Sequence, residues 1–274
     1  MLATLLYLME GLILTLFVIF TSISWSKLLT KFFNFPLQSL SEELLIGFTL
    51  FNYFLIIPFL IVGIFTSAGN FFFVVYTLAN VGLATFTFLA KVKRKKKCVL
   101  FTRRKGILIK IKMQEHSICT ILFFASLAYL YITISLVTIF HTIYLDAADA
   151  RLFYIPFAWS IKETGGLRIN KYTGSVFDTR YAPLIPITYA YLSIFDEKLN
   201  RIYPLIYLIM QMFLIYDLAL SLFKHLIKKN DERTVLGYLS TIIFICTPFV
   251  LASLFHYSLH VDLAFTFYLY LTLL

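Results

Sequence analysis

The chain has 274 residues, of which 60% are hydrophobic, 18% aromatic and only 14% charged, and its mean hydropathy is +0.86. This composition excludes an ordinary soluble domain and is typical of an integral membrane protein. A formal net charge of +10 would suggest nucleic-acid binding in a soluble protein, but 11 of the 24 basic residues lie between Lys91 and Lys112. Such clustering is typical of a loop that sets membrane orientation, so we expect membrane lipids as partners and no nucleic acid.

About seven apolar stretches approach or exceed the roughly 20 residues that a helix needs to cross a bilayer core of about 30 Å. They cover approximately residues 3–23, 44–65, 71–90, 117–144, 202–223, 235–256 and 261–274. The predicted fold class is therefore all-α, a polytopic transmembrane helix bundle. The first stretch has no basic flank before it and is longer than a signal-peptide core, so we expect it to be retained as a span.

Two features near the second and third stretches concern helix ends and orientation. Ser39, Ser41, Glu42 and Glu43 predict a helix cap with acidic residues in the first turn. The basic segment 91–116 is interpreted as a cytoplasmic loop under the positive-inside rule. A polybasic surface that recruits anionic lipid is the alternative.

Orientation follows from the order of the stretches. The two basic loops, 91–116 and the KHLIKKNDER segment after the fifth stretch, fall on one side, which we assign to the cytoplasm. The long segment 145–186 and the turn before the seventh stretch then fall on the non-cytoplasmic side. We expect a multi-pass protein, with the plasma membrane as its location.

The segment from Leu145 to Pro186 is the only long polar interruption of this apolar chain. Within it, Phe153, Phe157 and Ile161 repeat at a spacing of four, which predicts a helix lying at the membrane interface. Gly165 and Gly166 are expected to end this helix. The apolar residues 183–195 are too few for a full crossing, so we expect them to dip into the membrane or lie along it.

Two carboxylates on the predicted outer face are candidate catalytic groups. Asp149 opens the interfacial helix and Asp262 begins the seventh stretch, so two helix ends would bring two acids to one surface. Such a pair suits a general base, or ligands for a divalent cation. A plain helix cap explains Asp149 equally well. The three cysteines, Cys98, Cys119 and Cys246, have no motif spacing and predict neither disulfides nor a metal site.

Three short motifs in order resemble membrane glycosyltransferases of the GT-C superfamily, in the branch of protein O-mannosyltransferases and lipid A aminoarabinose transferases. Asp149–Ala158 (DARLFYIPFA) is similar to the family's D-A-x-x-Y-H-x-P-x-A, with Phe153 for the tyrosine and Tyr154 for the histidine. Tyr181–Pro186 (YAPLIP) is similar to its Y-x-P-L-x-P segment. Asp262–Phe265 (DLAF) is similar to its D-x-P-L-A-F-F helix start, without the proline.

The resemblance implies transfer of a sugar, with inversion, from a polyprenyl-phosphate carrier to a lipid or protein acceptor on the non-cytoplasmic face. It implies Asp149 as the general base and Asp262 as a second catalytic acid, with Tyr154 and Tyr181 lining the acceptor site. The leaving phosphate needs cations. The basic residues of the loop are the candidates: Arg151, Lys162, Arg168, Lys171 and Arg180. Arg168 and Arg180 come first, because a guanidinium group can bind phosphate with two hydrogen bonds. No cofactor is implied, although the carboxylate pair would accept a divalent cation.

The resemblance covers about residues 117–274, preceded by three additional spans in residues 1–90. The family continues for several further spans, so the chain is expected to correspond to the N-terminal portion of such an enzyme. The alternative is a non-catalytic membrane subunit or a transporter fragment, in which the acids cap helices or couple ions. Glu10, Asp217 and Pro248 are the features in the apolar stretches that fit this alternative.

Overall fold

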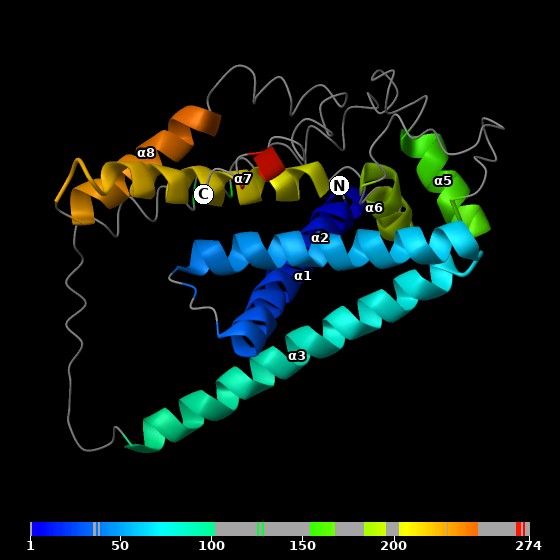
Figure 1. Ribbon diagram of the computed structural model, residues 1–274, viewed down its shortest axis with the longest axis horizontal. Helices are drawn as coiled ribbons and strands as arrows, with labels where there is room; N and C mark the ends of the chain where they lie inside the picture. The colour runs from blue at the N-terminus through cyan, green and yellow to red at the C-terminus, as the bar shows by residue number, and fades with distance from the viewer. Residues whose placement is uncertain are drawn as a thin grey trace.

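Every element in the described part of this computed structural model is a helix. The described residues are 2–34, 37, 39–101, 125, 128, 154–167, 184–195, 203–228, 230–245, 267–269 and 271. The helices are α1 (Leu2–Phe33), α2 (Leu40–Phe65), α3 (Gly69–Phe101), α5 (Ile155–Thr164), α6 (Leu184–Ser193), α7 (Tyr203–Phe223) and α8 (Asn230–Ile245). Over these residues the prediction of an all-α chain is confirmed (Figure 1).

Four of these helices are long and apolar enough to cross a membrane: Met9–Phe33, Leu40–Phe65, Gly69–Ala90 and Leu205–Phe223. They correspond to the first, second, third and fifth predicted spans. The predicted spans at 117–144 and 261–274 lie largely outside the described residues. Helix α8 covers the first part of the predicted span at 235–256.

Helix α1 continues past the predicted end at Ile23 to Phe33. The sequence between Leu12 and Phe33 holds no glycine or proline to stop it. Its serines and threonines are accommodated because their hydroxyls donate to carbonyls one turn back, as Ser22 does to the Val18 carbonyl at 2.6 Å. The helix is followed by Asn34, whose φ of 51° is the left-handed conformation in which asparagine commonly follows a helix.

Helices α1 and α2 cross in direct backbone contact (Figure 1). A β-carbon built on Gly47 of α2 would overlap the carbonyl oxygen of Ser22 in α1. The absence of a side chain at this position therefore permits the crossing, as small residues do where membrane helices approach closely. Leu14 and Val18 of α1 and Phe48 of α2 are buried in the same core.

The predicted cap of α2 is confirmed. Ser39 precedes the helix, and its hydroxyl accepts from the Glu42 amide at 3.0 Å. Helix α3 packs back against both preceding helices. The Tyr76 hydroxyl donates to the Phe51 carbonyl of α2 at 2.6 Å, and the Trp25 indole of α1 donates to the Asn80 side chain at 2.8 Å. These polar contacts fix the relative rotation of α1, α2 and α3.

The outer face of α3 carries exposed apolar side chains, as a lipid-facing surface does. They are Phe71, Val74, Val75, Leu78, Val81, Phe86, Phe88 and Leu89. Beyond Ala90 the same helix runs through Lys91, Lys93 and Arg94 to Phe101. The basic segment therefore begins as a continuation of α3.

Helices α6 and α7 complete the core on the other side of α2. Every residue of α6 from Ile185 to Ser193 is buried within the protein. Its ten residues are too few to span a bilayer, as predicted from its length. Helix α7 packs between α2 and α8, with the Tyr207 ring edge-on to Phe48 at 5.0 Å. Tyr216 of α7 stacks on Tyr238 of α8 at 5.1 Å.

Candidate functional site

The described part of the predicted outer loop, residues 145–186, consists of residues 154–167, which include α5, and residues 184–186, which begin α6. Of the predicted site residues, Tyr154 and Lys162 fall within it. The others lie outside the described residues: Asp149, Arg151, Arg168, Lys171, Arg180, Tyr181 and Asp262. The site can therefore be built from α5, α6 and the elements that hold them.

Helix α5 ends as the glycine pair predicts. Gly165 has a φ of 66°, and its amide donates to the Ile161 carbonyl at 2.8 Å. This left-handed conformation favours glycine because it places a β-carbon unfavourably. Here a β-carbon would also overlap the Ser67 carbonyl in the turn between α2 and α3. The end of α5 therefore lies against that turn.

Three hydrogen bonds join the end of α5 to α2 and α3. The Gly69 amide donates to the Gly165 carbonyl at 2.8 Å, and the Leu167 amide donates to the Gly63 carbonyl at 2.8 Å. The Asn70 side chain donates to the Lys162 carbonyl at 2.7 Å. The turn between α2 and α3 has the sequence TSAGN (residues 66–70), and no contact of this turn with α5 was predicted from the sequence. Its glycine and asparagine could have indicated such a contact, because both residue types favour close backbone approach in turns.

Lys162 and Tyr154 occupy different environments on α5. Lys162 is half-buried in the last turn of the helix, beside the contact with the turn between α2 and α3. Tyr154 directly precedes α5 and is only 7% exposed, packed in the same core as Phe157 and Ile161. Its ring thus anchors the start of α5. Phe157 and Ile161 lie in this helix as predicted and are buried within the protein. The position of the helix at the membrane interface stays a prediction.

An aromatic layer beneath α5 connects α6 to α3. Tyr191 of α6 lies 5.6 Å from the Phe73 ring and 5.5 Å from the Tyr76 ring. Its hydroxyl is 3.1 Å from that of Thr77. Phe73 in turn stacks on Phe59 at 4.5 Å. Because α5 packs on α6, the contacts that join α6 to α3 also help to hold α5 in place.

A second polar site lies where α2 begins and α7 nears its end. The Ser41 hydroxyl donates to Asp217 Oδ1 at 2.6 Å, and the Ser39 hydroxyl lies 2.9 Å from Ser41. Asp217 Oδ2 is buried and has no hydrogen-bond partner among the described residues. In the sequence, Asp217 stands out as an acidic residue inside an apolar stretch. Its partner, 176 residues earlier in the chain, could not be identified from the sequence.

The described residues contain no group of three or more histidine, cysteine, aspartate or glutamate side chains placed to hold a metal ion. The carboxylate pair for which a divalent cation was considered lies outside them. Comparison of the chain with protein family models, with curated proteins and with solved structures finds no match.

Proposed function

We propose that the chain belongs to a membrane glycosyltransferase that moves a sugar from a polyprenyl-phosphate carrier to a lipid or protein acceptor on the non-cytoplasmic face. The observation that carries the proposal is the motif order Asp149–Ala158, Tyr181–Pro186 and Asp262–Phe265. The packing of the loop supports it. The first motif ends in α5 and the second ends in α6, and these helices pack on each other.

In the proposed reaction the acceptor hydroxyl attacks the anomeric carbon of the sugar. The bond from that carbon to the carrier's phosphate oxygen breaks, so the configuration inverts and the electron pair leaves with the lipid phosphate. The acceptor's proton passes to the Asp149 carboxylate, acting as general base. Arg168 and Arg180 are the first candidates to stabilise the negative charge that develops on the phosphate, and Arg151 and Lys162 follow.

The attachment of α5 to the turn between α2 and α3 would help to position the general base, Asp149, against the acceptor hydroxyl. A base must stay within hydrogen-bond reach of the proton it removes, and small displacements of reacting groups are costly. Asp149 lies six residues before the first residue of α5, Ile155. A rigid α5 therefore limits the range of positions that Asp149 can take.

The test is sugar transfer from a radiolabelled polyprenyl-phosphate sugar in membranes that contain the chain. Asp149→Asn keeps the shape of the side chain and removes the base, so we expect the rate to fall by about 10²- to 10⁴-fold. Asp178→Asn, in the same loop but outside all three motifs, is the matched control and should retain activity. Equal activity of wild type and Asp149→Asn, at equal expression, would remove Asp149 from the mechanism.

One observation favours a second candidate function, ion-coupled transport. Asp217 lies in a helix apolar enough to cross a membrane. One of its oxygens is bound by Ser41, and the other is buried without a partner among the described residues, which suits an ion-coupling group. If Asp217 couples transport, Asp217→Asn should abolish proton-dependent solute uptake into vesicles and leave sugar transfer unchanged. Loss of sugar transfer alone in Asp149→Asn would favour the glycosyltransferase.

A further inference from the structure

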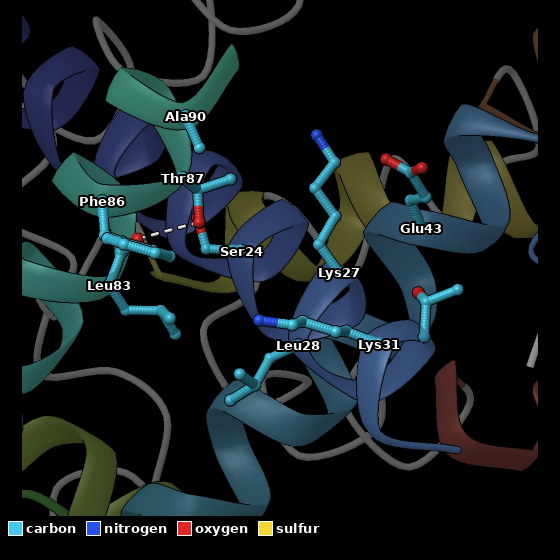
Figure 2. Close-up of a pocket in the computed structure, with 10 residues that line it drawn as sticks. Ser24, Lys27, Leu28, Lys31, Glu43, Leu83, Phe86, Thr87 and Ala90 are labelled. Atoms are coloured by element: carbon cyan, nitrogen blue, oxygen red, sulfur yellow. Dashed lines mark hydrogen bonds between the residues drawn. The ribbon is translucent and has the colours of Figure 1, made fainter. Parts of the chain in front are cut away.

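A pocket of about 670 Å³ lies between the C-terminal half of α1, the first turn of α2 and the middle of α3 (Figure 2). It is lined by Ser24, Lys27, Leu28, Thr30, Lys31, Glu43, Leu83, Phe86, Thr87 and Ala90. Glu43 and Phe65, near the two ends of α2, are about 33 Å apart at about 1.5 Å per residue. The pocket and the α5 site therefore lie at opposite ends of the bundle.

Two lysines supply the positive charge of the pocket. Lys27 is half-buried and Lys31 is exposed, and their spacing of four places them on one face of α1. Among the described residues, neither amino group has a hydrogen-bond or ion-pair partner. Glu43 also lines the pocket, but it lies in the first turn of α2, where the exposed amides of the helix stabilise a carboxylate. The two lysines and Glu43 together give the pocket one net positive charge.

The hydroxyl groups of the pocket already donate their protons elsewhere. Ser24 donates to the Phe20 carbonyl at 2.8 Å, Thr30 to Ser26 at 2.6 Å and Thr87 to Leu83 at 2.9 Å. Figure 2 shows the last of these bonds as a dashed line. The two ammonium groups are therefore the side-chain donors that the described lining offers to a ligand. A ligand that matches them is an anion with several acceptor oxygens, as a phosphate has.

The rest of the lining is apolar and continuous with the lipid-facing side of α3. Leu28, Leu83 and Ala90 contribute to it, and Phe86 is 69% exposed. Immediately after Ala90, α3 enters the basic sequence KVKRKKK. The pocket thus lies at the depth where an apolar span gives way to charge, which is the depth of lipid phosphates.

We propose that this pocket binds the phosphate headgroup of an anionic membrane lipid. Lys27 and Lys31 donate to the phosphate oxygens, and an acyl chain lies along Leu83 and Phe86. The same lysines would otherwise simply extend to the membrane surface as solvated charges, so the test must separate a site from general charge attraction. The proposal does not depend on sugar transfer.

The experiment measures binding of phosphatidylglycerol to the full-length chain reconstituted in phosphatidylcholine nanodiscs. The test protein is the double variant that carries both Lys27→Gln and Lys31→Gln. The matched control is Lys224→Gln with Lys228→Gln, two exposed lysines between α7 and α8, which removes the same charge elsewhere. Because a lysine near an anionic surface typically contributes about fivefold in affinity, we expect the pocket pair to lose about 30-fold and the control about twofold or less.

The charge-preserving pair Lys27→Arg with Lys31→Arg should bind phosphatidylglycerol within about threefold of wild type, which shows that the loss is not a failure to fold. Equal binding by wild type and the glutamine pair would overturn the proposal, as would equal losses in the pocket and control variants. A second measurement tests whether soluble glycerol phosphate competes with phosphatidylglycerol for the pocket. If it competes for the pocket at the concentration at which phosphatidylglycerol binds, the ligand is a free phosphate and the lipid assignment is wrong.

Discussion

Gly47 and Ser41 each determine a contact between two helices. Gly47 allows the backbones of α1 and α2 to touch at Ser22, and Ser41 provides the one hydrogen bond that Asp217 has among the described residues. The Gly47 contact is buried and the Ser41–Asp217 hydrogen bond is partly buried, so little can compensate for their loss. Neither was predictable from the sequence, because a glycine or a serine in an apolar helix does not reveal its partner.

Replacing Gly47 by alanine should destabilise the bundle. The added methyl group would overlap the Ser22 carbonyl, and overpacking of a tight interface costs about 1–3 kcal/mol. The measurement is the free energy of unfolding by denaturant in detergent micelles. Gly82→Ala is the matched control, because a β-carbon at Gly82 meets nothing within 4 Å. If Gly47→Ala is as stable as Gly82→Ala, the close crossing of α1 and α2 is wrong.

Replacing Ser41 by alanine should cost about 1–3 kcal/mol, since the Asp217 carboxylate, whose Oδ2 is already buried without a partner among the described residues, would lose its hydrogen bond. Thr85→Ala is the control. Its exposed hydroxyl donates only within its own helix, to the Val81 carbonyl at 2.8 Å, so its loss should cost less than about 0.5 kcal/mol. In the Asp217→Asn background the cost of Ser41→Ala should shrink. An unchanged cost in that background would show that the two side chains do not interact.

At the scale of elements, helix α5 depends on its contact with the turn between α2 and α3. Its existence and its glycine stop were predicted from the spacing of Phe157 and Ile161 and from Gly165. The burial of Phe157 and Ile161 within the protein was not, because a helix at the membrane interface was expected. The docking partner of α5 was not predicted either, because hydrogen bonds to Gly63, Gly69 and Asn70 connect residues about a hundred positions apart in the chain. From its apolar sequence, α6 was expected to dip into the membrane or lie along it. An apolar sequence is equally typical of a helix buried within the protein, so the sequence could not distinguish the two environments.

Gly165→Ala should release α5 from this contact. Alanine is strained at a φ of 66° and its methyl group would meet the Ser67 carbonyl. We expect faster amide hydrogen exchange over residues 155–167 with little change in α1. Gly166→Ala should have a smaller effect, since its nearest atoms would be 3.1 and 3.2 Å away. Unaltered exchange in Gly165→Ala would mean that α5 is held by other contacts.

For the whole molecule, the four apolar helices place the start of α2 and the end of α3 at one end of the bundle and α5 at the other. The spans were predictable because a bilayer requires long apolar helices, whatever their partners. Their exact ends were less predictable, since no glycine or proline stops α1 before Phe33 and α3 continues into its basic sequence. The two acids assigned to catalysis, Asp149 and Asp262, stay predictions because they lie outside the described residues.

The orientation of the bundle can be tested with single cysteines in a variant that lacks Cys98, Cys119 and Cys246. Glu163→Cys, exposed on α5, should react with a membrane-impermeant maleimide added to intact cells. Lys228→Cys, exposed after α7, should react only after permeabilisation, because the basic loops are expected inside. Labelling of both residues from the same side would contradict the assigned topology.

The most direct test of the account is the side of the membrane on which sugar is transferred. Right-side-out and everted vesicles containing the chain would each receive a radiolabelled polyprenyl-phosphate sugar and an impermeant acceptor. We predict transfer to the acceptor outside right-side-out vesicles and none to the acceptor outside everted ones, because Asp149 lies in the loop assigned to the non-cytoplasmic face. Transfer only in everted vesicles would contradict the topology, and absence of transfer in both would contradict the proposed function.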